Sequence, residues 1–374
     1  MAEIDLSNRI PGRLYSLDAL RGFDMFWIMG AEEIVHGLFK ATHHSFFESF
    51  SNQLTHPAWD GFHMYDCIFP LFLFIAGVAS PYSIGKEVEK GQSKTAILYK
   101  IAKRALILVL LGLVVNNGLV IRPIAEIRFG SVLGRIGIAY MFANFIFLNT
   151  KTQWSRITWF CSLLIGYYLL LKFNAAPGFP KGDLSQAGNF ASYLDRLYLP
   201  GKLYLGNHDP EGLTSTIPAI GTGLLGIIVG TYLKNSIDRG SKKSLILFLI
   251  GIAFILIAKV WNLDFPINKN LWSSSFTMLV GGISIIFLSV FYYVIDVKGY
   301  RYWAFFFNVI GMNSILIYIS GHFINWDYST NSLFHWVGQL LGEPYNAVAF
   351  SALYVFVQWL FLYFMYKQKV FLKV

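Results

Sequence analysis

Long apolar stretches alternate with short polar segments along most of the chain, and this pattern predicts helices that cross a membrane. Several stretches reach the roughly 20 apolar residues that a helix needs to span a bilayer. Ten predicted spans cover residues 18–39, 64–85, 99–116, 131–149, 155–172, 217–234, 244–261, 271–296, 302–321 and 346–366. We therefore expect an all-α polytopic membrane protein of about ten transmembrane helices, with residues 1–374 in a single domain.

The composition supports a membrane protein and argues against a nucleic-acid partner. Of the 374 residues, 55% are hydrophobic and only 14% are charged, whereas a soluble domain carries about 25% charged residues. The net charge of +9 is the excess of Lys and Arg that cytoplasmic loops of membrane proteins carry. No arginine-rich run with interleaved aromatic residues lies outside the spans, so we expect no nucleic-acid binding.

The basic residues between the spans predict the orientation of the chain. With both termini in the cytoplasm, 19 Lys and Arg residues lie on the inner side and 9 on the outer side, as the positive-inside rule requires. The longest segment between spans, residues 173–216, is then external and is too long for a simple connector. Within the span that follows, "GTGLLGIIVG" at 221–230 predicts close helix packing through small residues.

Ionisable and amide side chains gather at the predicted external ends of the spans, where they are expensive and usually functional. They mix one histidine with carboxylates and amides, a combination that suits a polar, hydroxylated or amino-bearing ligand such as a sugar. Trp59 fits the membrane interface as well as it fits sugar stacking. The residues of this external group are Glu32, His56, Trp59, Asp60, Asp66, Asp209, Glu211, Asn268 and Lys269.

Asp66 is the most informative member of the external group. It lies about one turn into an apolar helix, where an unpaired carboxylate costs about 2.5–3.5 kcal/mol. The sequence offers His63, His56 and Arg135 as partners, and structural pairing alone would account for any of them. His56 itself precedes a span, and an isolated loop histidine is more often structural than catalytic.

A second, cationic group lies at the predicted inner side. Lys100, Lys103 and Arg104 fall within about one and a half turns of a helix, and Asp18 and Arg21 are three residues apart at the start of the first span. Three cations so close together can receive a phosphorylated group, or they can serve only as a topology signal. The adjacent His43 and His44 lack a spaced third ligand, so we expect no metal site.

Several of these motifs resemble one known family of transmembrane acyltransferases, the heparan-α-glucosaminide N-acetyltransferases. The most specific motif is "HPAWDGFHMYDCIFPLFLFIAGVA" at 56–79, and the resemblance covers nearly the whole chain. The other motifs are "RLYSLDALRGFDMFWI" at 13–28, "RFGSVLGRIGIAY" at 128–140, "DPEGLTSTIPAIGTGLLGIIVG" at 209–230, "INKNLWSSSF" at 267–276 and "GMNSILIYISG" at 311–321. The bacterial branch of the family, which is linked to N-acetylglucosamine use, is the most similar.

The resemblance implies transfer of acetyl from cytoplasmic acetyl-CoA to the amine of a glucosamine unit on the far side of the membrane. His56 matches the histidine of the family's "HASWNG"-type motif, and Glu32 stands where the lysosomal relative has asparagine. We expect His56, Asp66 and Glu32 to be catalytic. We expect acetyl-CoA to meet Arg104, Lys100, Lys103, Arg21 and Arg135, and the amino sugar to meet Trp59, Asp60, Asp209, Glu211, Asn268 and Lys269. The family further implies a homodimer surrounded by membrane lipid, here in the bacterial inner membrane.

Two questions stay open from the sequence. The amine can attack the thioester directly with His56 as base, or His56 can first take the acetyl group itself. A membrane transporter of an amino sugar is the alternative function, because polytopic helices with intramembrane acids fit it too. No inverted repeat or pair of broken helices is visible in the sequence to support transport.

Overall fold

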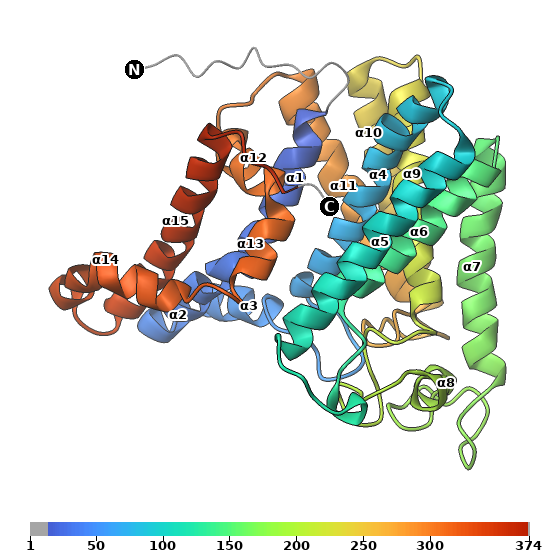
Figure 1. The fold of residues 1–374 in the computed structure, drawn as a ribbon, viewed down its shortest axis with the longest axis horizontal. Coiled ribbons are helices and arrows are strands. Elements are labelled where there is room, and N and C mark those ends of the chain that lie inside the picture. Colours follow the sequence, from blue (N-terminus) through green and yellow to red (C-terminus); the bar gives the residue numbers. More distant parts are fainter. Residues whose placement is uncertain (1–13, 373–374) are drawn as a thin grey trace.

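The computed structural model describes residues 14–372, and within them it is built from α-helices without any β-strand. Most long helices run roughly along one common direction, and short helices and loops gather at one end of them (Figure 1). The helices are α1 (Tyr15–Phe26), α2 (Glu32–Thr42), α3 (Ser45–Gln53), α4 (Ile68–Glu89), α5 (Lys94–Asn117), α6 (Val132–Asn149), α7 (Gln153–Phe173), α8 (Phe190–Tyr198), α9 (Thr216–Asn235), α10 (Gly240–Trp261), α11 (Ser274–Phe291), α12 (Ala304–Met312), α13 (Ser314–Ser320), α14 (Trp326–Leu341) and α15 (Tyr345–Lys367).

One end of the bundle carries most of the polar loop structure. Helices α2, α3 and α14 lie across this end, and α8 lies there within the long segment 174–215 (Figure 1). The segments 54–63 and 262–273 belong to the same end, because each connects helices there. This is the end that the charge pattern predicts to be external, and we call it the loop end.

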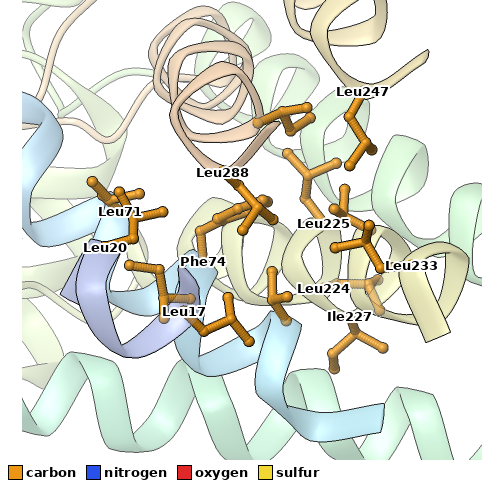
Figure 2. Close-up of a cluster of buried hydrophobic side chains, with 14 of the residues drawn as sticks. Leu17, Leu20, Leu71, Phe74, Leu224, Leu225, Ile227, Leu233, Leu247 and Leu288 are labelled. Atoms are coloured by element: carbon orange, nitrogen blue, oxygen red, sulfur yellow. The ribbon is translucent and has the colours of Figure 1, made fainter. Parts of the chain in front are cut away.

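The core of the bundle is a cluster of buried aliphatic and aromatic side chains from eight helices: α1, α4, α6, α7, α9, α10, α11 and α12. Phe74 of α4, Leu224 of α9 and Leu288 of α11 are fully buried in it (Figure 2). The cluster also includes Leu17, Leu20, Leu71, Leu225, Ile227, Leu233 and Leu247. In lipid these contacts stabilise the bundle through close packing, since the surrounding acyl chains are equally apolar.

Glycines allow two pairs of helices to touch backbone to backbone. A Cβ atom on Gly77 of α4 would lie 2.1 Å from the carbonyl oxygen of Gly223 in α9, and one on Gly226 would lie 2.1 Å from that of Phe74. The packing predicted for "GTGLLGIIVG" is therefore confirmed. At the crossing of α1 and α12, a Cβ atom on Gly22 would lie 1.7 Å from the backbone carbonyl oxygen of Phe307. This close crossing was not predicted from the sequence.

Seven helices of the described chain are long and apolar enough to cross a membrane. They are Met64–Glu89, Val132–Asn149, Gln153–Phe173, Thr216–Asn235, Gly240–Trp261, Ser274–Val297 and Tyr345–Lys367. The first begins with the 3₁₀ turn Met64–Cys67, and the sixth ends with the π-helical turn Tyr292–Val297. These seven coincide with predicted spans. The count of ten and the cytoplasmic placement of the termini remain predictions.

The other three predicted spans depart from a long apolar helix for identifiable reasons. The span predicted at 18–39 is interrupted by a π-helical turn, Trp27–Ala31, in which Gly30 has a φ of 107°. The freed carbonyl of Met29 there accepts a hydrogen bond of 2.8 Å from Gln358 of α15. Helix α5 carries four basic residues in its first half, and the span predicted at 302–321 divides into α12 and α13 at Asn313.

Candidate functional site at the loop end

The site begins with a histidine and a carboxylate on either side of a tight turn. Asp66 lies in the 3₁₀ turn Met64–Cys67 that leads into α4, and its side chain is fully buried. Its Oδ1 atom lies 2.7 Å from Nδ1 of His56, and its Oδ2 atom accepts the backbone N–H of His63 at 3.0 Å. An ionised carboxylate can only accept, so Nδ1 of His56 carries the proton and Nε2 presents its lone pair.

Lys269 completes this pair from a segment 213 positions away along the chain. Its Nζ atom lies 2.9 Å from Nε2 of His56 and 3.5 Å from Oδ1 of Asp66. Burial lowers the pKa of Lys269, and the attraction of Asp66 opposes this effect. The ammonium group of Lys269 thus lies near both ring nitrogens of His56, 2.9 Å from Nε2 and 3.2 Å from Nδ1, while the imidazole keeps 47% of its surface exposed.

The segment that carries Lys269 is fixed to the segment that carries His56. Asn268 is fully buried; its Nδ2 donates to Oδ1 of Asp60 at 3.0 Å, and its Oδ1 accepts the N–H of Leu271 at 2.8 Å. The backbone N–H of Gly61 donates to the Ile267 carbonyl at 3.0 Å. Asn268 therefore positions the two loops relative to each other, and its amide is occupied in doing so.

Trp272 holds the far side of the same loop in an unusual conformation. Its backbone φ is 49°, a value that residues other than glycine rarely adopt. Such a conformation persists only where the surrounding structure enforces it. The indole is buried, packs against Phe69 at a centroid distance of 4.8 Å and donates to Thr222 at 3.3 Å. The guanidinium of Arg135 lies over the same indole ring, 5.0 Å from its centroid.

Glu32 lies next to this pair, separated from it by one aromatic side chain. The hydroxyl of Tyr65 donates to Oε1 of Glu32 at 3.3 Å, and the Tyr65 ring lies 5.1 Å from the His56 ring. The other carboxylate oxygen of Glu32 is buried and has no hydrogen-bond partner. Glu32 therefore does not orient His56 directly. Tyr65 is a further member of the site, and no motif in the sequence indicated it.

Asp209 and Glu211 tie the segment 174–215 to one arginine, Arg128. Arg128 donates to Oδ1 of Asp209 at 2.8 Å and also pairs with Glu211. Burial alone would raise the pKa of Asp209, but the hydrogen bonds from Arg128 outweigh it and hold that pKa below its ordinary value. A Cβ atom on Gly130 would lie 2.8 Å from the Asp209 carboxylate, so only glycine leaves room for this pair.

Trp59 belongs to the same buried interface between loops. Its Nε1 donates to the Leu184 carbonyl at 3.0 Å, and its ring meets the His208 ring edge to face at 5.0 Å. Burial lowers the pKa of His208 to about 4, so this imidazole is neutral at physiological pH. Trp59 thereby fastens the segment 56–63 to the segment 174–215.

The predicted cofactor residues lie in two places. Lys100 pairs with Glu87 at 3.0 Å, and Lys103 is exposed. Arg104 lies over the Tyr140 ring at 4.6 Å with its buried Nε lacking a hydrogen-bond partner. In α1, Arg21 pairs with Asp18 at 3.3 Å. Arg135, in contrast, lies with the loop-end group, where it donates to the Gly212 carbonyl at 3.3 Å and to the Ser215 hydroxyl.

The structure thus brings His56, Asp66 and Lys269 into direct contact and places Glu32 one side chain away. Of the three partners considered for Asp66, His56 and the backbone of His63 are the ones it uses. Asp60, Trp59 and Asp209 make contacts that fix the loops. A half-exposed imidazole that is oriented by a buried carboxylate can take a proton on its second nitrogen from a bound amine or hydroxyl.

Comparison with known proteins agrees with the motif resemblance. A family model described as heparan-alpha-glucosaminide N-acetyltransferase, catalytic, matches residues 13–259. The human protein named heparan-alpha-glucosaminide N-acetyltransferase is 29% identical over 429 residues, covering 98% of this chain and 60% of that protein. The mouse protein of that name is 30% identical over 381 residues, covering 85% of this chain and 56% of that protein.

The chain spans less than two thirds of the length of these two relatives. The matched family segment nevertheless contains Glu32, His56, Asp66 and the basic residues of α5, and the alignment with the human protein extends over nearly all of the chain. The chain therefore belongs to the family of heparan-alpha-glucosaminide N-acetyltransferase catalytic domains.

Proposed function

We propose that the protein is a transmembrane N-acetyltransferase that moves acetyl from cytoplasmic acetyl-CoA to the amine of glucosamine or a terminal glucosamine unit at the loop end. The observation that carries this proposal is the position of Lys269. Its Nζ atom lies 2.9 Å from Nε2 of His56, so an alkyl ammonium group fits against the proton-accepting nitrogen. A substrate ammonium that displaces Lys269 would occupy the position required for deprotonation.

In this proposal His56 acts as the base and Asp66 positions it. Asp66 fixes the tautomer of His56, and Nε2 takes one proton from the substrate ammonium, because a protonated amine has no lone pair for attack. The amine nitrogen then forms a bond to the thioester carbonyl carbon, and the carbon–sulfur bond breaks when the intermediate collapses. Two protons leave the nitrogen in total; one ends on the sulfur of coenzyme A and the other in the external water.

The arrangement along the bundle supports a donor that enters from the other end. Arg104 lies 13 residues before the end of α5, about 20 Å from the loop end at 1.5 Å per residue. Its buried Nε has no hydrogen-bond partner, and a phosphate oxygen is a suitable acceptor for it. We propose that Arg104, with Lys100 and Lys103, binds the phosphorylated part of acetyl-CoA while the thioester extends toward His56.

The test is an assay of the purified full chain with acetyl-CoA and a panel of amino sugars, following the release of free thiol. We expect thiol release with glucosamine, and we expect His56→Ala to abolish it while the thermal unfolding profile is retained. A folded and fully active His56→Ala variant would contradict the proposal. Uptake of labelled glucosamine into proteoliposomes without acetyl-CoA would favour transport instead.

The same assay distinguishes direct transfer from transfer through an acetylated His56. Direct transfer requires both substrates at once, so double-reciprocal plots of the initial rates would intersect. An acetyl-histidine intermediate predicts parallel lines. The 2.9 Å contact between His56 and an ammonium group favours the direct route, in which His56 acts as the base.

A further inference from the structure

A second feature of the loop end lies beside Glu32. A cavity of about 470 Å³ opens there between the bend after α1, the end of α13, the start of α14 and the middle of α15. Its volume falls within the range of about 300–1,000 Å³ typical of small-molecule sites. The carboxylates of Glu32, Glu33 and Asp327, the ring of Tyr354 and the backbone at Gly321 contribute to its walls.

The charge of the lining is one-sided. Glu32 and Glu33 come from the start of α2 and Asp327 comes from α14. Among the described residues that line the cavity, His322 is the one basic side chain and none is Lys or Arg. One oxygen of Glu32 is buried without a hydrogen-bond partner. A buried acceptor in this state normally has a partner, and a donor in the cavity would supply one.

Aromatic side chains supply the rest of the surface. Tyr318, Trp326 and Tyr354 line the cavity, and aromatic faces attract cations and the apolar faces of sugar rings. The Trp326 indole is fixed in place because its Nε1 donates to the Ser320 hydroxyl at 3.1 Å. A ligand with a cationic group and an apolar ring face could pair its charge with the carboxylates and pack its ring face on the aromatic side chains.

The bend at Gly30 explains why the cavity exists and why it adjoins the catalytic pair. The positive φ of Gly30 turns α2 across the end of the bundle and brings Glu32 and Glu33 to the cavity wall. Gln358 of α15 stabilises this bend through its hydrogen bond to the Met29 carbonyl. Through Tyr65, the Glu32 end of the cavity is one side chain away from His56.

We infer that this cavity is the acceptor site and that its carboxylates select a protonated amino sugar over neutral sugars. The ammonium group first binds at the Glu32 end, and the sugar ring lies toward α14 and α15. From there the amine passes Tyr65 to reach His56, where it displaces Lys269 before it loses its proton. This inference rests on the proposed acetyltransferase function for the identity of the ligand. It assigns the cavity, Glu33 and Asp327 to substrate selection.

The first test measures occupancy without any catalysis. A Cβ atom on Gly321 would meet nothing within 4 Å, so Gly321→Cys places a thiol in open space at the cavity wall. The background variant is Cys161→Ser, because Cys161 is exposed and Cys67 is buried. We expect glucosamine to slow maleimide labelling of Gly321→Cys at least fivefold, whereas glucose and N-acetylglucosamine leave it unchanged.

The control for labelling is Ser49→Cys, on the exposed surface of α3 and outside the cavity. Its labelling rate should not respond to glucosamine. Equal protection of Gly321→Cys by neutral sugars, or no protection by glucosamine, would overturn the inference. Protection by ethanolamine without protection by glucosamine would also overturn it, since the cavity would then accept an amine headgroup rather than a sugar.

The second test uses the transfer assay. Glu32→Gln and Asp327→Asn should each raise the KM for glucosamine about tenfold, the effect of losing roughly 1.4 kcal/mol of binding, with the KM for acetyl-CoA unchanged. The control is Glu48→Gln, an exposed acid on α3. If wild type releases no thiol while glucosamine still protects Gly321→Cys, the proposed function fails and the cavity assignment stands. Active variants with unchanged KM would overturn the cavity assignment alone.

Discussion

Nδ1 of the half-exposed His56 lies 2.7 Å from Oδ1 of the fully buried Asp66. This contact fixes which imidazole nitrogen is free, because the carboxylate can only accept a hydrogen bond. The geometry explains why a carboxylate lies in an apolar helix: its two oxygens accept from His56 and from the backbone of His63, so neither is left without a partner.

The first prediction concerns this contact. Asp66→Asn should lower kcat/KM for acetyl transfer by about 10²- to 10⁴-fold, the range for loss of general base function, because the amide no longer enforces the proton on Nδ1. Initial rates and a thermal unfolding curve of the same preparation measure the effect. Asp264→Asn, at an exposed carboxylate in the same loop as Lys269, should keep the wild-type rate. A folded Asp66→Asn variant with wild-type activity would refute the assigned role.

The second prediction follows from the lowered pKa of Lys269. The native state binds fewer protons at this site than the unfolded chain does between the lowered pKa and the ordinary value of 10.5. Stability therefore rises with pH in that window. The Tm of wild type, taken relative to that of Lys269→Met, should increase as the pH is raised from 7 toward 10.5.

The matched control for this prediction is Lys172→Met. Lys172 is exposed at the end of α7, where its ammonium group pairs with the exposed carboxylate of Asp264, so no burial opposes its charged form. Its Tm difference from wild type should stay constant between pH 7 and 10. A constant difference for Lys269→Met as well would contradict the lowered pKa.

The sequence was sufficient to predict the seven long apolar helices and to name His56 among the candidate partners of Asp66, for physical reasons that lie in single segments. Apolar length predicts a span directly, and the cost of a carboxylate in lipid made Asp66 a residue that required a partner. The contact of Lys269 with His56 was not predictable in this way, since it joins positions 213 residues apart. It depends on the Asn268–Asp60 hydrogen bond that aligns the two loops.

The interruptions of helices inside apolar segments could not be predicted from hydropathy either. Gly30 and Asn313 divide predicted spans, yet neither residue changes the average hydropathy of its segment much. Helix α14 was missed because its aromatic and polar residues mix, and this composition is typical of an element at a membrane interface. The acceptor cavity depends on these interruptions, so the sequence alone gave no means to find it.

The third prediction concerns the ion pair between Arg128 and Asp209 at the loop end. Asp209→Asn should destabilise the protein by about 1–3 kcal/mol, because the largely buried Arg128 loses its charged hydrogen bonds to Asp209 and keeps only Glu211 as a counter-charge. The measurement is the thermal unfolding of the purified variant. Removing all three charges, in Arg128→Met with Asp209→Asn and Glu211→Gln, should restore part of the loss. A triple variant less stable than Asp209→Asn alone would argue against a paired role.

The fourth prediction concerns the crossing of α4 and α9, which places the start of α4, and with it Asp66, against the rest of the core. Gly77→Ala should disrupt folding, because the added Cβ atom would lie 2.1 Å from the backbone oxygen of Gly223 and backbone cannot move aside cheaply. Gly166→Ala in α7 is the matched change, since its Cβ atom meets nothing within 4 Å. It should leave thermal stability unchanged or slightly raised, because alanine favours helix over glycine. Size-exclusion profiles in detergent and Tm values compare the two variants. Equal Tm values and profiles for Gly77→Ala and Gly166→Ala would contradict the prediction, because they would mean that α4 and α9 can move apart without loss of stability.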